Sequence, residues 1–305
     1  MKYLVLGSNG FIGRNLIKEL KKEKCDLRLF DLRINKESSC INNNIEYIQG
    51  EFGIDCDFDS LTKDVDIVYH LISTTIPSSN IEYNIEIQQN VMATIKLLDS
   101  CVKNKIKKII FISSGGTVYG KSKGIPFKED DCTNPICSYG IQKLSIEKYI
   151  QLYHNMYGLD YRIIRLANPY GIGQNPIGGL GAVTTFVYKL VKDEPITIFG
   201  DGGVVRDYIY IDDAILDIIN ITRYEGNYKL FNVGSGIGHS LNEIVRTIEE
   251  VLNKQFVVNY EKGRSVDVPY NVLDIERLKS IFPNRKTTSL AEGIRILSDH
   301  FKKIY

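Results

Sequence analysis

The sequence has little of what marks several common classes of protein. Its 305 residues carry a net charge of only +1, without long blocks of like charge, so the basic footprint of a nucleic-acid-binding protein is missing. No apolar run is long enough to span a membrane, and the apolar start at 2–6 is broken by Gly7 too soon for a signal peptide. We therefore expect a cytosolic protein with no nucleic-acid or membrane partner.

The sequence also lacks the spacing of a metal site. None of the cysteines forms a CxxC pair, and the four histidines are dispersed along the chain. His70 ends an apolar stretch, where a hydrogen-bonded core histidine is expected rather than a metal ligand. We expect reduced thiols and no metal. The six cysteines are Cys25, Cys40, Cys56, Cys101, Cys132 and Cys137.

The order of apolar patterns indicates the fold class. The first half alternates short β-rich runs with longer helical patterns, which is typical of a parallel sheet wrapped by helices. We therefore predict an α/β fold with a Rossmann-type, doubly wound parallel sheet. Strands are expected at 2–6, 26–30, 45–49, 66–72, 107–113 and 160–166, and helices near 11–23, 81–104 and 138–157.

The pattern changes after residue 167, where a glycine-rich loop begins that runs to Gly181. We predict a nucleotide-binding domain at 1–170, completed by 205–237, and a smaller, discontinuous α/β lobe at 171–204 and 238–305. The lobe is expected over the carboxyl ends of the strands, where open α/β sheets bind ligands. Residues 208–233 are expected to complete the main sheet. The later predicted elements are helices 182–192 and 240–253 and strands 196–199 and 255–260.

A glycine-rich turn follows the first predicted strand and precedes the first helix. In Gly7-Ser8-Asn9-Gly10-Phe11-Ile12-Gly13, Gly7 permits the turn, Gly10 lets the backbone approach phosphates, and Gly13 allows close packing of helix on strand. Asp31 lies 18 residues after Gly13, at the end of the second strand, where a carboxylate meets the adenosine ribose. Because that carboxylate would repel a 2′-phosphate, we expect NAD rather than NADP, although Arg33 lies nearby.

A second signal is the pair Tyr139 and Lys143, whose spacing of four places both on one face of a helix. A free tyrosine has a pKa near 10, too high for a base at neutral pH. A neighbouring ammonium and the positive nicotinamide ring both favour the phenolate, so we expect a lowered pKa for Tyr139. Lys143 could also reach the nicotinamide ribose.

These motifs, with Ser113-Ser114-Gly115-Gly116-Thr117-Val118-Tyr119-Gly120 and Val205-Arg206-Asp207-Tyr208, resemble the extended short-chain dehydrogenases/reductases. Within them, the chain is similar to nucleotide-sugar 4-epimerases of the UDP-galactose 4-epimerase type. The resemblance covers nearly the whole chain and is more specific for the superfamily than for the reaction. It implies that the residues beside NAD, besides Gly7, Gly10 and Gly13, are Phe11, Ile12, Asp31, Glu51, Phe52, Leu71, Ile72, Ser73, Asn90, Tyr139, Lys143 and Pro169.

The resemblance also implies where the nucleotide sugar is held. Arg206 and Arg264 match arginines on the diphosphate, which suits charge-assisted hydrogen bonds. Asp267 matches a residue on the nucleotide ribose, Phe199 one beside the base, and Asn168 one on the diphosphate.

Two departures from the family pattern bear on the chemistry. Many relatives carry Ser or Thr in place of Gly115, and that hydroxyl relays the proton between the sugar O4 and the tyrosine. Ser114 and Thr117 are the nearby hydroxyls, and we expect Thr117 to take the role. Relatives that dehydrate the sugar carry an Asp-Glu pair where this chain has Gly116 and Thr117, which argues against a 4,6-dehydratase.

The reaction that the resemblance implies is NAD-dependent 4-epimerisation of a UDP-hexose through a transient 4-keto sugar. Asn271, of intermediate size, leaves open both plain hexoses and N-acetylhexosamines. No extra arginine in 171–181 is available to hold a uronic carboxylate, which disfavours UDP-glucuronate. The alternatives are an NDP-4-keto-6-deoxyhexose reductase or a catalytically silent NAD-binding protein. Helices 81–104 and 138–157 correspond to those that pair subunits in relatives, so a homodimer is expected.

Overall fold

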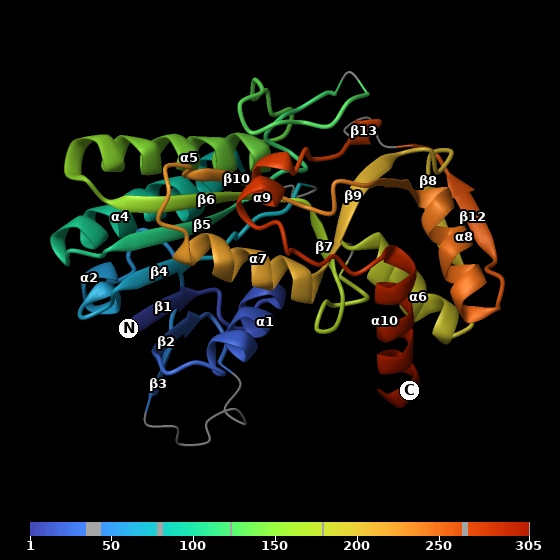
Figure 1. Ribbon diagram of the computed structural model, residues 1–305, viewed down its shortest axis with the longest axis horizontal. Coiled ribbons are helices and arrows are strands. Elements are labelled where there is room, and N and C mark those ends of the chain that lie inside the picture. The colour runs from blue at the N-terminus through green and yellow to red at the C-terminus, as the bar shows by residue number, and fades with distance from the viewer. Residues whose placement is uncertain (35–43, 78–81, 123, 179, 264–267, 305) are drawn as a thin grey trace. The chain divides into compact units, whose positions relative to one another are not determined.

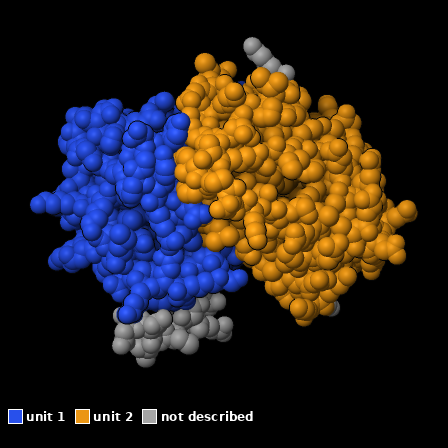
Figure 2. All heavy atoms as spheres, in the orientation of Figure 1, with its two compact units in different colours: residues 1–118, 135–164, 219–230 blue, residues 119–134, 165–218, 231–305 orange. Residues whose placement is uncertain are grey.

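A computed structural model describes residues 1–34, 44–77, 82–122, 124–178, 180–263 and 268–304. The chain divides into two compact units, coloured blue and orange in Figure 2. Unit 1 comprises 1–118, 135–164 and 219–230, and unit 2 comprises 119–134, 165–218 and 231–305. These boundaries differ from those of the predicted domains. The functional division into a cofactor domain and a substrate lobe stays a prediction.

Seven strands of the described chain form the main sheet, in the order β10-β6-β5-β4-β1-β2-β3 (Figure 1). The pairs β1–β2, β2–β3, β1–β4 and β4–β5 are parallel. The strand order reverses direction next to β1, which is the arrangement of a doubly wound nucleotide-binding sheet. The predicted fold class is thereby confirmed. The strands are β1 (Lys2–Leu6), β2 (Asp26–Asp31), β3 (Ile45–Gln49), β4 (Ile67–His70), β5 (Lys108–Ser114), β6 (Asp160–Leu166) and β10 (Leu230–Val233).

The inner strands β1 and β4 are apolar in near-continuous runs, as is typical of a parallel sheet whose two faces are covered by helices. Every residue of β4 is buried, and so are Leu4, Val5 and Leu6 of β1. Helix α1 turns Leu16, Ile17 and Leu20 inward at helical spacing. The helices that contribute to unit 1 are α1 (Phe11–Leu20), α2 (Phe58–Thr62), α3 (Tyr83–Glu86), α4 (Ala93–Lys103), α5 (Ser138–Tyr157) and part of α7 (Ile211–Arg223).

The helix expected at 81–104 is interrupted by a π-helical segment, η2 (Ile87–Met92), between α3 and α4. Such π-helical turns occur frequently at functional sites. Helix α5 has the predicted bounds and ends at Gly158, which adopts φ +75° and donates its N–H to His154 O at 2.8 Å. No helix in the described ranges is long and apolar enough to cross a membrane.

Unit 2 contains a smaller sheet built on β9 (Val205–Tyr210). Strands β7 (Asn168–Tyr170) and β13 (Tyr270–Asn271) pair with β9 in parallel, and β11 (Gly238–Ser240) pairs with it antiparallel. The expectation that 208–233 completes the main sheet therefore holds for β10 but not for β9, whose hydrogen bonds are taken by these three strands. The other elements are α6 (Ala182–Val191), β8 (Ile196–Phe199), α8 (Leu241–Leu252), β12 (Val258–Glu261), α9 (Glu276–Ile281) and α10 (Leu290–Ile304).

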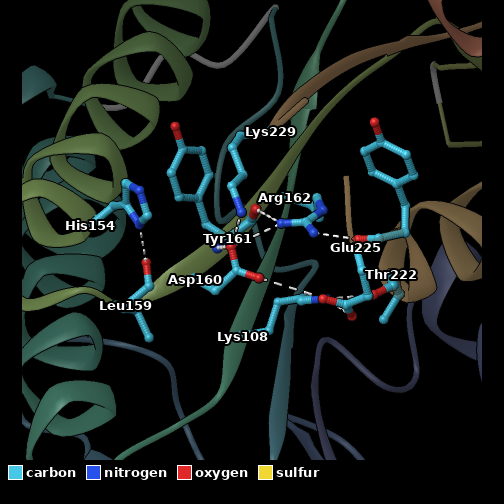
Figure 3. Close-up of polar contacts among 10 residues, drawn as sticks. Lys108, His154, Leu159, Asp160, Tyr161, Arg162, Thr222, Glu225 and Lys229 are labelled. Atoms are coloured by element: carbon cyan, nitrogen blue, oxygen red, sulfur yellow. Dashed lines mark hydrogen bonds and ion pairs between the residues drawn. The ribbon is translucent and has the colours of Figure 1, made fainter. Parts of the chain in front are cut away.

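The amino-terminal ends of β5 and β6 carry a charged cluster around Asp160 (Figure 3). Lys108 Nζ lies 2.9 Å from Glu225 Oε1, 3.0 Å from Thr222 O and 3.7 Å from Asp160 Oδ2. Arg162 Nη1 and Lys229 Nζ contact Asp160 Oδ1 at 2.9 and 2.5 Å. Because Thr222, Glu225 and Lys229 all belong to 219–230, the cluster fastens that segment to the sheet.

Candidate active site

The glycine-rich turn connects β1 to α1 and is held against the end of β2. The N–H groups of Gly7 and Ser8 donate to Phe30 O at 2.9 and 3.2 Å, and Gly7 adopts φ +88°. A Cβ on Gly13 would lie 2.1 Å from Gly7 O, so no other residue fits there. The first amides of a helix have no carbonyl partner within the helix. The amides of Phe11 and Ile12, which open α1, are therefore suited to bind a pyrophosphate.

Three candidate residues for the adenosine half lie at the end of β2 or shortly after β3. Asp31 Oδ2 accepts the N–H of Asn9 at 2.9 Å, which fixes the carboxylate against the glycine-rich turn. Glu51 is exposed. Phe52 is buried in the core, where its ring lies 5.3 Å from that of Phe58 and 5.1 Å from that of His70. A contact between Phe52 and the adenine would therefore involve its main chain.

The segment after β4 is tied to the π-helical turn through Asn90. The Asn90 side chain accepts the N–H of Thr74 at 3.0 Å and donates to Gln142 Oε1 at 2.8 Å. Gln142 in turn donates to Glu86 Oε2 at 2.7 Å. Ile72 and Ser73, which precede Thr74, line the same small cavity as Tyr139 and Gln142 of α5. Sequence reasoning missed Glu86 and Gln142, although the i,i+4 spacing of Glu86 and Asn90 puts them on one helix face.

Tyr139 and Lys143 lie on successive turns of α5, as their spacing predicts. Lys143 is buried, and its Nζ donates to Ile112 O of β5 at 2.9 Å. The same Nζ lies 5.6 Å from the centroid of the Tyr139 ring. A Cβ on Gly140 would lie 2.9 Å from Thr117 O, so the glycine lets α5 pack closely on the loop after β5.

Burial dominates the titration of both residues. It raises the pKa of Tyr139 to about 12; the charge of Cys137 acts in the same direction and a hydrogen bond with Ser114 opposes it. It lowers the pKa of Lys143 to about 8, against the attraction of Glu147. The expected lowering of the Tyr139 pKa is therefore not produced by the protein alone, because desolvation of the phenol outweighs its neighbours.

The two hydroxyls near Tyr139 have different surroundings. The Ser114 side chain is hydrogen-bonded to Tyr139. Thr117 Oγ1 is buried and makes no hydrogen bond with any described residue. A buried hydroxyl without a partner is costly, so Thr117 is suited to bind a polar group of a ligand. The relay role expected of Thr117 stays a prediction.

Two further side chains near Tyr139 and Lys143, those of Ser113 and His70, are buried. Ser113 Oγ donates to Glu147 Oε1 at 2.5 Å, one helical turn beyond Lys143. His70 Nε2 lies 2.9 Å from Thr94 Oγ1, so the expectation of a hydrogen-bonded core histidine is confirmed. In the ranges that the structure describes, no group of three or more His, Cys, Asp or Glu side chains could hold a metal ion.

Of the substrate-binding candidates, Ser114 and Thr117 belong to unit 1, whereas Asn168, Phe199 and Arg206 belong to unit 2, as does the cofactor candidate Pro169. Asn168 donates to Asp207 O at 2.8 Å, and Arg206 Nη1 donates to Val268 O at 2.7 Å. Pro169 lies on β7 and Phe199 ends β8. Arg264 and Asp267 lie outside the described residues.

Asp207 is a buried residue that sequence reasoning named only as part of a motif. Its carboxylate accepts the N–H and hydroxyl of Ser235 at 2.8 and 2.7 Å and the N–H of Gly236 at 3.1 Å. Asp207 therefore holds the turn after β10 against β9, next to Arg206.

Comparison with known proteins supplies the context for this geometry. The model of the NAD dependent epimerase/dehydratase family matches residues 3–234. A Methanocaldococcus jannaschii protein, named provisionally as a UDP-glucose 4-epimerase, is 33% identical over 96% of this chain and 95% of its own. The Escherichia coli dTDP-4-dehydro-6-deoxyglucose reductase is 34% identical over 95% of this chain and 94% of its own.

Among solved structures, the UDP-glucose 4-epimerase of Thermotoga maritima with UDP-glucose superposes with a TM-score of 0.91. It is 29% identical in sequence, and the match covers 100% of this chain and 99% of that one. The likeness therefore extends over both units rather than over the nucleotide-binding part alone.

Proposed function

The chain belongs to the NAD dependent epimerase/dehydratase family, and from this premise we propose that it is an NAD-dependent nucleotide-sugar 4-epimerase. The substrate would be a UDP-hexose or a UDP-N-acetylhexosamine. The observation that carries the proposal is the pairing of Tyr139 with the buried Lys143, in the same unit as the glycine-rich turn. The chemistry that bound NAD would supply is reversible hydride transfer at the sugar C4.

The residues of unit 1 fit this cofactor. The open amides at the start of α1 suit the pyrophosphate, and the Asp31 carboxylate suits a ribose with free hydroxyls. Leu71, Ile72 and Ser73 would line the dinucleotide after β4. Pro169 of unit 2 would lie against the nicotinamide.

Tyr139 acts in this proposal as the base that removes the O4 proton and the acid that returns it. The phenol must ionise for this step, and the neighbouring Lys143 ammonium together with a positive nicotinamide favours the phenolate. Thr117 passes the proton between O4 and the phenol, and Ser114 holds the phenol by its hydrogen bond. A sugar tethered only by its diphosphate can turn within the pocket, so the 4-keto form can be reduced on either face.

The diphosphate would be held by Arg206 and Arg264, with Asn168 beside it. Phe199 would lie next to the base and Asp267 would bind the nucleotide ribose. The glycine-rich loop at 171–181 suits a pocket that must accept both C4 epimers. Asn271 is buried on β13. Its intermediate size does not decide between a sugar that carries a hydroxyl and one that carries an N-acetyl group, so both are tested.

We also propose that the enzyme is a homodimer through α5 and the segment 83–92. Both present apolar side chains to solvent, which is the mark of an interaction surface. Along α5 these residues follow one face at helical spacing. They are Tyr83, Ile85, Ile87 and Met92 on the first segment and Ile141, Tyr149, Leu152 and Met156 on α5. A cytosolic location stays a prediction.

The test is incubation of purified protein, without added cofactor, with UDP-glucose, UDP-galactose and their N-acetylamino forms. We expect NMR to show conversion to the C4 epimer with NAD retained by the protein. The Tyr139→Phe variant should bind NAD and not turn over. An active Tyr139→Phe variant would remove the proposed base.

The second candidate function is reduction of an NDP-4-keto-6-deoxyhexose, which the Escherichia coli relative favours. The same Tyr139–Lys143 pair would then act once, and a reduced cofactor would be consumed. Oxidation of NADH or NADPH on addition of a 4-keto sugar nucleotide, without epimerisation of UDP-hexoses, would establish the reductase instead.

A further inference from the structure

His70 ends β4 with its imidazole buried behind the Tyr139–Lys143 pair. Only 1% of the residue is exposed, and its ring lies 5.1 Å from that of Phe52 and 5.3 Å from that of Phe111. Its Nε2 lies 2.9 Å from Thr94 Oγ1. The Thr94 hydroxyl donates to Asn90 O at 2.6 Å. The ring is therefore connected to the π-helical turn through one side chain.

These contacts determine the tautomer of the ring. Burial, with a contribution from the Lys143 charge, lowers the pKa of His70 to about 3, so the imidazole is neutral. A threonine hydroxyl has one hydrogen, and Thr94 gives it to Asn90 O, so Thr94 must accept a hydrogen from His70 Nε2. Nδ1 then carries a lone pair. It is buried and makes no hydrogen bond with any described residue.

The imidazole of His70 lines a small cavity that Tyr139 and Lys143 also line. The cavity has a volume of about 10 Å³, about the space of a single water molecule. Lys143 has three N–H groups, and the structure gives one of them a carbonyl acceptor, Ile112 O. The remaining lining of the cavity consists of Ile72, Ser73, Asn90, Thr94, Gln142 and Ile146.

We propose that one water in this cavity joins Lys143 Nζ to His70 Nδ1. The ammonium donates to the water, the water donates to the Nδ1 lone pair, and Nε2–H donates to Thr94, which donates to Asn90 O. The direction of the ammonium is thereby fixed from β4 as well as from β5. His70 is a positioning residue, and the inference rests on the proposed function because it assigns Lys143 a part in the reaction.

The charged and titratable groups around Lys143 decide what this link changes. From α5 it faces Tyr139 and Glu147. From β5 it faces the Phe111 ring and Ile112 O, and from β4 the neutral His70. The nearest residues of η2 and α4, Asn90 and Thr94, are uncharged. Without the Nδ1 acceptor the water no longer holds the ammonium by a hydrogen bond, so the pKa of Lys143 falls further and the side chain loses its proton at lower pH.

Two substitutions separate the two ring nitrogens. In His70→Gln the amide can replace the Nε2 donor to Thr94, but no acceptor stands at the Nδ1 position. In His70→Asn the amide oxygen can take the Nδ1 position, while the bond to Thr94 is lost. We expect His70→Gln to move the alkaline limb of the kcat/KM profile down by about one pH unit. His70→Asn should restore the limb toward the wild-type position.

Two measurements do not depend on activity and use the whole protein. A high-resolution crystal structure should show one ordered water within hydrogen-bond distance of both His70 Nδ1 and Lys143 Nζ. Nitrogen-15 NMR of histidine-labelled protein should show His70 as the Nε2–H tautomer, neutral from pH 5 to pH 8. The His70→Asn spectrum assigns the resonance.

Each outcome decides the matter. Identical pH profiles for His70→Gln and His70→Asn, a cavity without the water, or an Nδ1–H tautomer would each overturn the link. If the wild type shows no epimerase activity while the water and the tautomer are found, the proposed function fails and the positioning of Lys143 stands.

Discussion

Two lysines in unit 1 are equally buried and differ in their partners. Lys108 and Lys143 are each 5% exposed. Lys108, at the start of β5, lies within 4 Å of two carboxylates, Glu225 and Asp160 (Figure 3). Lys143 donates to the carbonyl of Ile112, near the opposite end of the same strand. Its Nζ also lies 4.8 Å from the centroid of the Phe111 ring and 5.6 Å from that of the Tyr139 ring.

The difference favours a structural role for Lys108 and supports the role proposed for Lys143. A buried cation paired with carboxylates contributes to folding, and breaking the pair is costly. A buried cation without such pairing is held at a cost in stability, and sites with perturbed pKa values are candidates for chemistry. The carboxyl ends of the strands, where Ile112 lies, are also where doubly wound sheets bind ligands.

The largest effect is expected from Lys143→Met, which removes the charge and keeps a side chain of similar length. We expect kcat/KM to fall roughly a hundredfold to ten-thousandfold. The free energy of unfolding at pH 7 should not fall, because desolvation of the Lys143 charge outweighs the attraction of Glu147 in the folded chain. Steady-state kinetics and urea unfolding measure the two quantities.

A pH series tests the same variant through linkage. Lys143 titrates at about 8 in the folded chain and at an ordinary value of 10.5 when unfolded. Between these values the unfolded chain binds more protons, so wild-type stability relative to Lys143→Met should rise as the pH is raised. Activity should fall over the same range. A wild type that loses stability relative to the variant above pH 8 would contradict the assignment.

The converse substitution is Lys108→Met, which leaves two acids with fewer partners at the amino ends of the strands. We expect a loss of about 2 kcal/mol in the free energy of unfolding, since the hydrogen bonds of the buried Lys108 Nζ to Thr222 O and to the exposed Glu225 are removed. Turnover by the folded enzyme should stay within about twofold of wild type. Urea unfolding and kinetics at 25 °C check both.

The neighbouring residue supplies a matched control. The side chain of Lys107 is 67% exposed, and its Nζ lies 2.7 Å from Asp66. Lys107→Met should cost less than about 1 kcal/mol, because exposed ion pairs contribute little. Equal losses from Lys107→Met and Lys108→Met would mean that burial of Lys108 has no bearing on stability.

The sequence allowed the prediction of features that depend on local patterns. Short β-rich runs predicted β1, β3 and β6 to the residue, and the four-residue spacing placed Tyr139 and Lys143 on successive turns of α5. The glycine-rich turn followed from its position between strand and helix. Each of these signals lies within a short stretch of chain.

Features that depend on distant packing were not predictable in this way. The net effect of burial on Tyr139 outweighed the neighbouring ammonium, which a sequence spacing cannot show. The Glu86–Gln142–Asn90 network joins residues more than fifty positions apart. Strand β9 left the main sheet because its partners, β7, β11 and β13, come from three separate parts of the chain.

The surroundings of Lys143, which include His70, and those of Lys108, which include Asp160, should also respond differently to acid. The folded pKa of His70, about 3, lies below the ordinary 6.5, so stability is lost as the pH falls below 6.5, where the unfolded chain takes up a proton. The loss should reach about 2 kcal/mol at pH 5. Burial would raise the pKa of Asp160, but Lys229 and Arg162 together hold it below 3.8. The stability that Asp160 contributes is therefore retained at every pH above 3.8. Urea unfolding at pH 7 and pH 5 should show a smaller drop for His70→Asn, and an equal drop would contradict this account.

The smallest effect sharpens the comparison with an uncharged group. Thr117 Oγ1 is buried and makes no hydrogen bond with the described residues, so Thr117→Val should raise the free energy of unfolding by about 1 kcal/mol. If the hydroxyl relays the O4 proton, the same change lowers kcat about tenfold without loss of bound NAD. Ser114→Ala is the matched control, because it removes the hydrogen bond to Tyr139 and should raise the pH at which the phenol ionises. A Thr117→Val enzyme that is both more stable and fully active would assign the relay to Ser114, since Gly115 has no side chain to supply it.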